Sequence, residues 1–280
     1  MANEYNNAKL GRIHVFEDTM RMTNEDHPKI WSSFQKSLQK SCVILDAAPP
    51  SPREGVETQI LVTRNKTMDA GRRWSKQYNT AVLNFASATT PGGGVTRGAG
   101  SQEECLCRVS TLYPLLSQPA FYESFYKPNR DANDPLHSDA LIYTPKVCVF
   151  KRDDYVLLDE KDYAYVDVIT CAAPNLRERP SNVYNPGDGV EAADCSPDRL
   201  YEIHVRRARH ILGAAVTHGV RAIVLGAFGC GAFKNDPEVV ARAWKLAVSE
   251  YAGSFDVIEF AIYCGGGDTT NYDAFAKEFS

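Results

Sequence analysis

Three near-continuous apolar runs constrain the fold of this chain most strongly. They are YVDVITCAA (165–173), VRAIVLGAF (220–228) and FDVIEFAIYC (255–264). Continuous rather than alternating apolar residues are typical of strands that are buried on both faces of a sheet. The segments between the runs begin with the helix-start signals Ser196-Pro197 and Asp236-Pro237. The sequence therefore predicts an α/β fold with three layers, a mixed but mostly parallel central sheet between two layers of helices.

The first sixty residues have a different pattern. A helix is expected to begin at Pro28, with an apolar face made of Ile30, Trp31, Phe34 and Leu38. Strand-like runs start only at residue 42 and continue with TAVLNFAS. The chain has 280 residues, near the size at which a single core stops growing. We expect one compact domain, with residues 1–60 as a helical extension packed on a core of residues 61–280.

The charge of the chain limits its partners. The formal net charge is −4, and no basic tail or long basic stripe is present. Direct DNA binding and binding to anionic membranes are therefore not expected. The one basic cluster lies within a helical pattern, where it predicts a solvated face, and comprises Arg206, Arg207, Arg209 and His210.

The eight cysteines indicate a reducing compartment rather than a disulfide framework. Several lie inside apolar runs, as buried thiols do. Cys105 and Cys107 are spaced C-x-C with no matching Cys or His pair nearby, so a zinc site is not expected. The N-terminus lacks the pattern of a secretion signal, and no apolar run reaches membrane-spanning length. These features predict a cytoplasmic protein.

Two glycine-rich turns follow two of the predicted strands. AVLNF leads into ASATTPGGG, and AIVLGAF leads into GCGAFKNDP. Both turns would lie at the carboxyl edge of the sheet, where α/β proteins bind ligands and where backbone N–H groups can hold phosphates. Glycines that merely permit tight turns are the alternative. Neither turn fits a P-loop or a G-x-G-x-x-G motif, which argues against a kinase or a Rossmann dehydrogenase.

Two adjacent acids, Glu103 and Glu104, follow the first turn. Ser101 and Glu104 fit a capping box, and Glu103 fits an acid favoured in a first helical turn. A carboxylate beside a bound phosphate, however, would have a raised pKa and could donate a proton to a leaving sugar oxygen. Local sequence leaves both interpretations open.

At this point the sequence resembles a known family, the bacterial-type poly(ADP-ribose) glycohydrolases, which have a macrodomain fold. The shared signature is GGG, a seven-residue spacer and Gln-Glu-Glu, here residues 92–94, 95–101 and 102–104. VLNFAS, VITCAAPN and GAFGCGAFKNDP extend the resemblance over residues 80–264.

The resemblance implies an exo-acting poly(ADP-ribose) glycohydrolase that needs no metal or cofactor and releases ADP-ribose by general acid/base catalysis. It makes Glu104 the catalytic acid and Glu103 the residue that orients the ribose. ADP-ribose or poly(ADP-ribose), free or on ADP-ribosylated proteins, would be the partner. The implied substrate-binding residues are Gln102 as a brace of the loop, Asn84, Gly92, Gly93, Gly94, Val95, Gly229, Cys230, Gly231, Ala232 and Phe233.

Two other functions fit the same glycine turns. A module that only binds ADP-ribose is one, although such a module has no physical need for the Gln-Glu-Glu triplet. A deacylase of acylated ADP-ribose is the other, and it would not need a protonated acid at the ribose.

Overall fold

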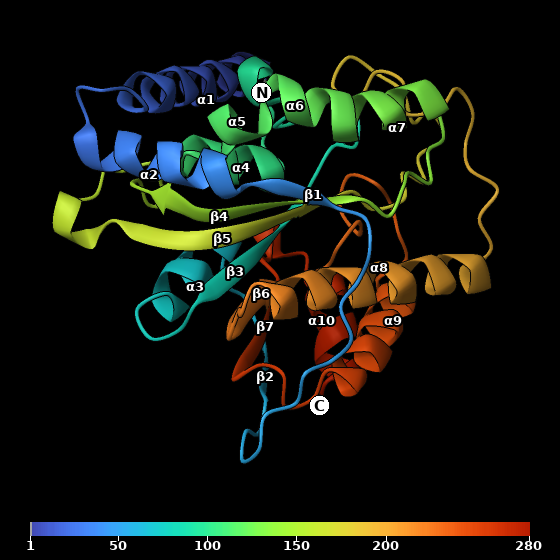
Figure 1. The fold of residues 1–280 in the computed structure, drawn as a ribbon. Helices are drawn as coiled ribbons and strands as arrows, with labels where there is room; N and C mark the ends of the chain where they lie inside the picture. The colour runs from blue at the N-terminus through green and yellow to red at the C-terminus, as the bar shows by residue number, and fades with distance from the viewer. Residues whose placement is uncertain (1) are drawn as a thin grey trace.

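A seven-stranded sheet forms the middle layer of the protein (Figure 1). The computed structural model describes residues 2–280, with side chains from residue 6 onward. The strand order is β1-β4-β5-β3-β6-β7-β2, with antiparallel pairing at β1–β4 and β4–β5 and parallel pairing elsewhere. The predicted mixed, mostly parallel sheet is confirmed. The strands are β1 (Cys42–Ile44), β2 (Gln59–Thr63), β3 (Thr80–Phe85), β4 (Leu141–Val149), β5 (Ala164–Cys171), β6 (Ala222–Leu225) and β7 (Val257–Ala261).

Helices cover both faces of this sheet, which confirms the three layers. In Figure 1, α1, α2 and α4 to α7 lie on one side, and α8, α9 and α10 lie on the other. No helix within residues 2–280 combines the length and the apolar character needed to cross a membrane. The first group, which α3 joins, is α1 (Ala2–Met22), α2 (Pro28–Lys40), α3 (Thr67–Trp74), α4 (Gln102–Val109), α5 (Leu112–Leu116), α6 (Pro119–Phe121) and α7 (Lys127–Ala132). The second group is α8 (Pro197–Thr217), α9 (Pro237–Glu250) and α10 (Thr270–Glu278). Shorter turns are η1 (Val95–Arg97), the π-helical η2 (Tyr122–Tyr126), η3 (Glu160–Asp162) and η4 (Gly265–Gly267).

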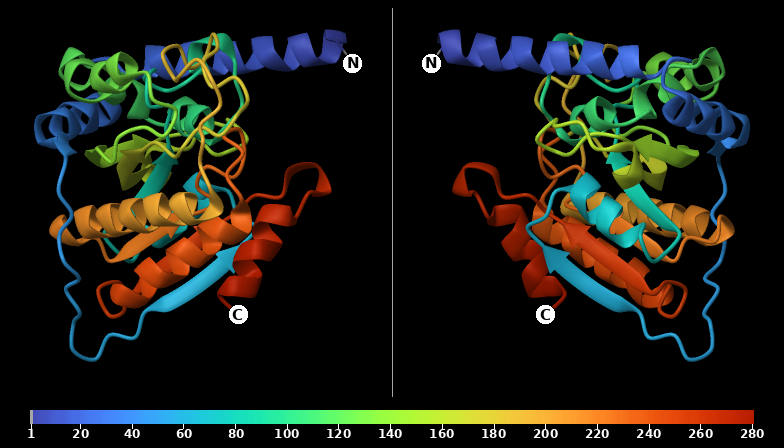
Figure 2. Two further views of the ribbon diagram at one scale, coloured as in Figure 1. Left: turned by 90° about the vertical axis from the view of Figure 1, so that its right-hand side faces the viewer. Right: turned by 90° about the vertical axis from the view of Figure 1, so that its left-hand side faces the viewer.

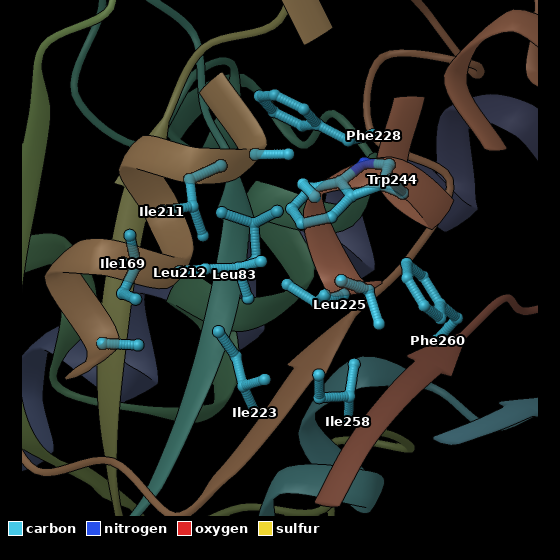
Figure 3. Close-up of a cluster of buried hydrophobic side chains, with 14 of the residues drawn as sticks. Leu83, Ile169, Ile211, Leu212, Ile223, Leu225, Phe228, Trp244, Ile258 and Phe260 are labelled. Atoms are coloured by element: carbon cyan, nitrogen blue, oxygen red, sulfur yellow. The ribbon is translucent and has the colours of Figure 1, made fainter. Parts of the chain in front are cut away.

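The strands are apolar throughout because both of their faces are buried. On β3, Leu83 packs into the cluster beneath α8 and α9, and its neighbour Val82 packs into the cluster on the opposite face. Ile169 and Val168 on β5 divide in the same way. Figure 3 shows the first cluster, in which Trp244 of α9 lies beside Leu225 of β6. Adjacent side chains of a strand point to opposite faces, so each central strand stabilises two cores.

The predicted helix starts are confirmed. Helix α2 begins at Pro28, and the Ser196 hydroxyl accepts a hydrogen bond from the Arg199 N–H at 3.2 Å. The Asp236 carboxylate accepts from the Glu238 N–H at 2.9 Å. These caps fix the first turns of α8 and α9.

The basic cluster on α8 was predicted to form a solvated face, and this is wrong for two of its four residues. Arg206 and Arg209 face solvent, but Arg207 and His210 are buried, with exposed fractions of 1% and 4%. The Arg207 guanidinium donates to the carbonyl oxygen of Ala172 at 2.7 Å. It also donates to the carbonyl oxygens of Leu136 and His137 and to the Asp139 carboxylate. A buried cation with this many acceptors holds the segment before β4 against the end of β5.

The N-terminal helices pack beside the first glycine turn and on β4. Figure 2 shows α1 along the upper edge of the molecule. Helix α2 lies on β4, where the Ser33 hydroxyl donates to the Lys146 carbonyl oxygen at 2.8 Å. The chain then enters the sheet as β1, whose partner is β4. The division into an extension of residues 1–60 and a core of residues 61–280 stays a prediction.

Candidate active site

Both glycine-rich turns leave the same edge of the sheet. They follow β3 and β6, which are parallel neighbours with Thr80 opposite Ala222. Helix α4 begins at Gln102, after the first turn and η1. The turns and the two glutamates therefore lie at the carboxyl ends of adjacent strands, where α/β sheets bind ligands.

Both carboxylate oxygens of Glu103 are held by protein donors. Oε1 accepts from Asn84 Nδ2 at 3.2 Å, and Oε2 accepts from the Ser87 N–H at 2.8 Å. The residue is 2% exposed. Its side chain is thus fixed between the end of β3 and the loop that follows it.

Glu104 has one bound oxygen and one free oxygen. Oε1 accepts from the Gly94 N–H at 2.8 Å, whereas Oε2 is buried and has no hydrogen-bond partner within residues 2–280. The capping-box interpretation is wrong, because the Ser101 side chain makes no cap hydrogen bond and Glu104 turns to Gly94 instead. An unpaired buried carboxylate oxygen costs free energy, and such groups are concentrated at functional sites.

The two carboxylates converge on Gly93. A Cβ atom at this position would lie 2.7 Å from Glu104 Oε1 and 3.1 Å from Glu103 Oε2. The residue also has a positive φ of 56°. Gly92 and Gly94 are equally constrained, since a Cβ would lie 2.6 Å from the Tyr113 ring and 2.5 Å from the Tyr184 ring, respectively. The triple glycine lets the backbone run directly over the acids.

Burial shifts the titration of Glu103. It raises the pKa of Glu103 to about 8, and the neighbouring charge of Glu104 adds to the rise. Hydrogen bonds from Ser87 and Asn84 oppose it. With this pKa, Glu103 holds a proton near neutral pH. Burial therefore accounts for a proton on Glu103, and the proton expected on Glu104 beside a bound phosphate stays a prediction.

Three predicted site residues support the acids from within the protein. Gln102 braces α4 on β3, since its Oε1 accepts from the Phe85 N–H at 2.9 Å and its Nε2 donates to the Leu83 carbonyl oxygen at 2.7 Å. Asn84 is fully buried behind Glu103, and Val95 is fully buried in the hydrophobic cluster beneath α4. The substrate contacts predicted for Asn84 and Val95 stay a prediction.

The two glycine turns differ in their free backbone donors. In the first turn, the Gly93 N–H donates to the Thr90 carbonyl oxygen at 3.0 Å and the Val95 N–H donates to the Gly92 carbonyl oxygen at 3.2 Å. In the second turn, four N–H groups have no acceptor among residues 2–280, those of Gly229, Gly231, Ala232 and Phe233. Gly231 and Ala232 are also exposed. Successive free N–H groups form a concave anion site, so the second turn is the better phosphate cradle; the role of both turns in phosphate binding stays a prediction.

The long loop of residues 174–197 covers both turns, a role that the sequence did not reveal. Tyr184 packs on Gly94 of the first turn, and the Arg177 guanidinium lies 5.7 Å from the ring centroid of Phe233 on the second. His137 lies 5.9 Å from the same ring. The half-buried Phe233 also packs against the core, as does the Cys230 side chain. Only the length of the loop and its Pro, Asn and Gly content pointed to a function.

The microbial-type PARG catalytic-domain model matches residues 12–152, half of the chain. The poly(ADP-ribose) glycohydrolase (PARG) from Thermomonospora curvata is 32% identical and has a TM-score of 0.80, over 96% of this chain and 99% of its own. The chain belongs to the microbial-type PARG family. The predicted family is confirmed, and so is the class of enzyme, a hydrolase of glycosidic bonds.

Other PARG structures are similar in the same way. The T. curvata enzyme bound to the inhibitor ADP-HPD is 32% identical with a TM-score of 0.79, over 96% of this chain and 99% of that chain. The PARG from Deinococcus radiodurans in complex with ADP-ribose is 32% identical with a TM-score of 0.73, over 88% of this chain and 96% of that chain. No curated protein matches this sequence.

Proposed function

We propose that this PARG hydrolyses the ribose–ribose O-glycosidic bonds of poly(ADP-ribose) from the end of the polymer and releases ADP-ribose. The similar Deinococcus structure holds ADP-ribose, and the similar Thermomonospora structure holds ADP-HPD. The ligand would lie at the carboxyl edge of β3 and β6, with its diphosphate on the free N–H groups of the second glycine turn. No metal or cofactor enters the proposed reaction.

The free Oε2 of Glu104 carries the assignment of the catalytic acid. The other three carboxylate oxygens of the pair already accept protein hydrogen bonds. Oε2 alone remains to exchange a proton with a ligand, and general acids act through such a direct hydrogen bond. Glu103, fixed by Asn84 and Ser87, would orient the ribose.

The proposed reaction has two proton transfers through one residue. Glu104 donates a proton to the leaving ribose oxygen while the glycosidic C–O bond breaks and positive charge develops on the anomeric carbon. Glu104, now a carboxylate, then accepts a proton from the water whose oxygen bonds to that carbon. Ordinary glycosidases place two carboxylates on opposite sides of the bond. Here Glu104 transfers the protons, and the adjacent Glu103 positions the substrate.

The remaining predicted residues would hold the substrate. Gly92, Gly93 and Gly94 bring the backbone close to the scissile bond, and the turn from Gly229 to Ala232 binds the diphosphate. Phe233 would lie along the ribose. We further propose that the polymer is bound free or on ADP-ribosylated proteins in the cytoplasm, which cell fractionation would test.

The test compares wild type with Glu104→Gln, and with Glu54→Gln as a control at an exposed position. Each protein is incubated with poly(ADP-ribose) in EDTA, free ADP-ribose is followed by chromatography, and ADP-ribose binding is measured by calorimetry. We expect Glu104→Gln to bind within a few-fold of wild type but to lose about two to four orders of magnitude in turnover. Retained hydrolysis would remove Glu104 from the acid role.

The same experiment separates the other functions. ADP-ribose as the first product supports exo action, whereas shortened polymers as the first products would contradict it. Binding without hydrolysis by wild type would make the protein a binding module. Release of acetate from acetylated ADP-ribose, with the polymer intact, would make it a deacylase.

A further inference from the structure

A second cavity lies at the opposite edge of the sheet from the proposed active site. It has a volume of about 1250 Å³ and is lined by α2, α3, the bend of β4 and the start of β5. In Figure 1 these elements meet at the left, where β3 and β5 begin. We name it the α2–α3 groove. The glycine turns follow the opposite ends of β3 and β6, so the groove is not part of the proposed catalytic site.

The α2–α3 groove is basic although the protein is acidic. Eight of its lining residues are Lys or Arg and two are Asp. Four carboxylates outside the lining pair with these cations, which leaves an excess of two positive charges, whereas the whole chain carries −4. Five of these cations pair with a carboxylate. The other three, Lys36, Lys40 and Lys76, have no carboxylate within 4.0 Å in the part of the chain that the structure describes. Clustered unpaired lysines attract a polyanion.

A backbone irregularity places a further lysine in the groove. The pairing of β4 with β5 shifts between Thr144 and Val147, and Lys146 within this bulge has a positive φ of 53°. This conformation is rare for residues other than glycine. The bulge is held on one side by α2, through Ser33, and on the other by Asp167, which accepts from the Lys146 N–H at 2.9 Å. Bulges re-aim side chains, and here the redirected side chain is a cation of the groove.

Aromatic rings lie among the cations. Tyr78, Tyr163 and Tyr165 line the groove, and Tyr165 is 38% exposed. Purine bases stack on such rings, and grooves that combine cations with aromatic residues are typical of proteins that bind single-stranded phosphate polymers without sequence preference. The groove therefore suits a ligand that alternates phosphates and bases.

We propose that the α2–α3 groove is a second binding site for poly(ADP-ribose), which holds a stretch of the polymer remote from the bond being cleaved. The inference rests on the proposed function, which brings this polymer to the molecule. The six residues of β3 put about 20 Å between the two edges of the sheet, and the path over the surface is longer. Only a polymer of several units can occupy both sites, so the groove would favour long chains over short ones.

The first test measures binding. The variant Lys36→Glu/Lys40→Glu/Lys76→Glu is compared with Lys127→Glu/Lys245→Glu/Lys277→Glu, which makes the same change in net charge at exposed lysines outside the groove. Both sets are placed in the Glu104→Gln chain, so that labelled polymer is not consumed. We expect the groove variant to bind long poly(ADP-ribose) at least about tenfold more weakly at 0.15 M salt, with a salt slope smaller by about 2. The control variant should match its parent.

The second test measures turnover in chains that keep Glu104. The groove variant should keep the wild-type kcat/KM for a polymer of two units, which also shows that it folds, and should have a higher KM for long polymer. Equal polymer binding by the groove variant would overturn the second site and leave the proposed function untouched. Equally tight binding of single-stranded RNA to the wild-type groove would overturn its assignment to poly(ADP-ribose). Groove-dependent binding without hydrolysis by wild type would overturn the proposed function alone.

Discussion

Arg12 of α1 donates a hydrogen bond from Nε to the carbonyl oxygen of Gly98, at 2.7 Å, in the loop that leads to the two glutamates. The contact is close, because a Cβ on Gly98 would lie 2.5 Å from the Lys9 carbonyl oxygen. Further along α1, the Thr19 hydroxyl donates to the Arg108 carbonyl oxygen of α4 at 2.5 Å. Helix α1 is thus attached both before and after the glutamates.

Arg12→Ala should therefore loosen the loop as well as the helix. We expect a loss of about 1 kcal/mol in the free energy of unfolding, from one partly buried hydrogen bond, and a several-fold lower turnover of poly(ADP-ribose). Urea unfolding and ADP-ribose release measure the two effects. Arg21→Ala is the control, since Arg21 is 77% exposed and its pair with Asp18 contributes little. Equal effects of the two substitutions would contradict the role of Arg12.

Removing residues 1–40 tests the proposed extension. The deletion exposes apolar surface that Phe16, Ile30 and Phe34 now cover. We expect a broadened thermal transition and loss of turnover, because α1 braces α4 and α2 lies on β4. Unchanged folding and turnover in the shortened chain would show that the extension serves neither purpose.

Gly93→Ala should damage the site through one added carbon atom. The new Cβ would lie 2.7 Å from Glu104 Oε1. The positive φ of residue 93 is also one that L-residues rarely adopt. We expect a loss of about 1 to 3 kcal/mol in stability and a loss of most activity. In the control, Gly11→Ala on α1, the Cβ meets no atom within 4 Å, and removing a glycine from a helix stabilises by about 0.5 to 1 kcal/mol. Opposite signs of the two stability changes are the expected result.

The pKa of Glu103 makes the stability of the protein depend on pH. Its value of about 8 in the folded protein exceeds the ordinary value of 4.5. The folded state therefore binds more protons than the unfolded chain between these pH values, and stability falls as the pH rises through this window. The contribution is complete below about pH 4.5 and is lost as the pH passes 8, with a slope of at most about 1.4 kcal/mol per pH unit.

Urea unfolding of wild type and Glu103→Gln at pH 5, 6.5 and 8 measures this dependence. The substitution should remove the part of the decrease in the free energy of unfolding with pH that Glu103 causes. As the pH rises, the variant should therefore gain stability relative to wild type. Glu123→Gln, at an exposed position, should keep the wild-type slope. Parallel curves for wild type and Glu103→Gln would contradict the shifted pKa.

Arg207→Ala should destabilise strongly, because it leaves several buried carbonyl oxygens and the Asp139 carboxylate without their donor. We expect a loss of about 3 to 5 kcal/mol in the free energy of unfolding. Arg206 pairs with the same Asp139 but is 57% exposed, so Arg206→Ala should cost about 1 kcal/mol or less. Differential scanning calorimetry of both variants gives the comparison.

The sequence predicted the central strands and missed two others for a physical reason. The strands β3, β5, β6 and β7 are buried on both faces and read as continuous apolar runs. Strand β2 is an edge strand with two exposed positions, and β4 is interrupted by Pro145 and by the bulge at Lys146. Neither strand presents an uninterrupted pattern, because half-covered and bent strands tolerate polar residues.

The sequence predicted the residues of the candidate site but not the hydrogen bonds between them. The motif located Glu103 and Glu104, yet the donor to Glu104 is Gly94, ten positions earlier, and only the folded loop brings the two together. The burial of Arg207 was equally hidden, since its acceptors lie some seventy positions away at Leu136 and His137. Contacts between distant segments depend on tertiary structure, which local propensity does not encode.

The pairing of β2 with β7 has a consequence for the nascent chain during its synthesis. Residues 59–63 cannot pair in the sheet until residues 257–261 have been synthesised. A ribosome that adds about 5 to 20 residues per second needs about 10 to 40 seconds to synthesise the residues between them. Strands β3, β5 and β6, which carry the proposed site, all leave the ribosome during this interval. The site can therefore form before β2 and β7 pair and complete the edge of the sheet. During this interval, chaperones that shield unpaired strands can bind β2.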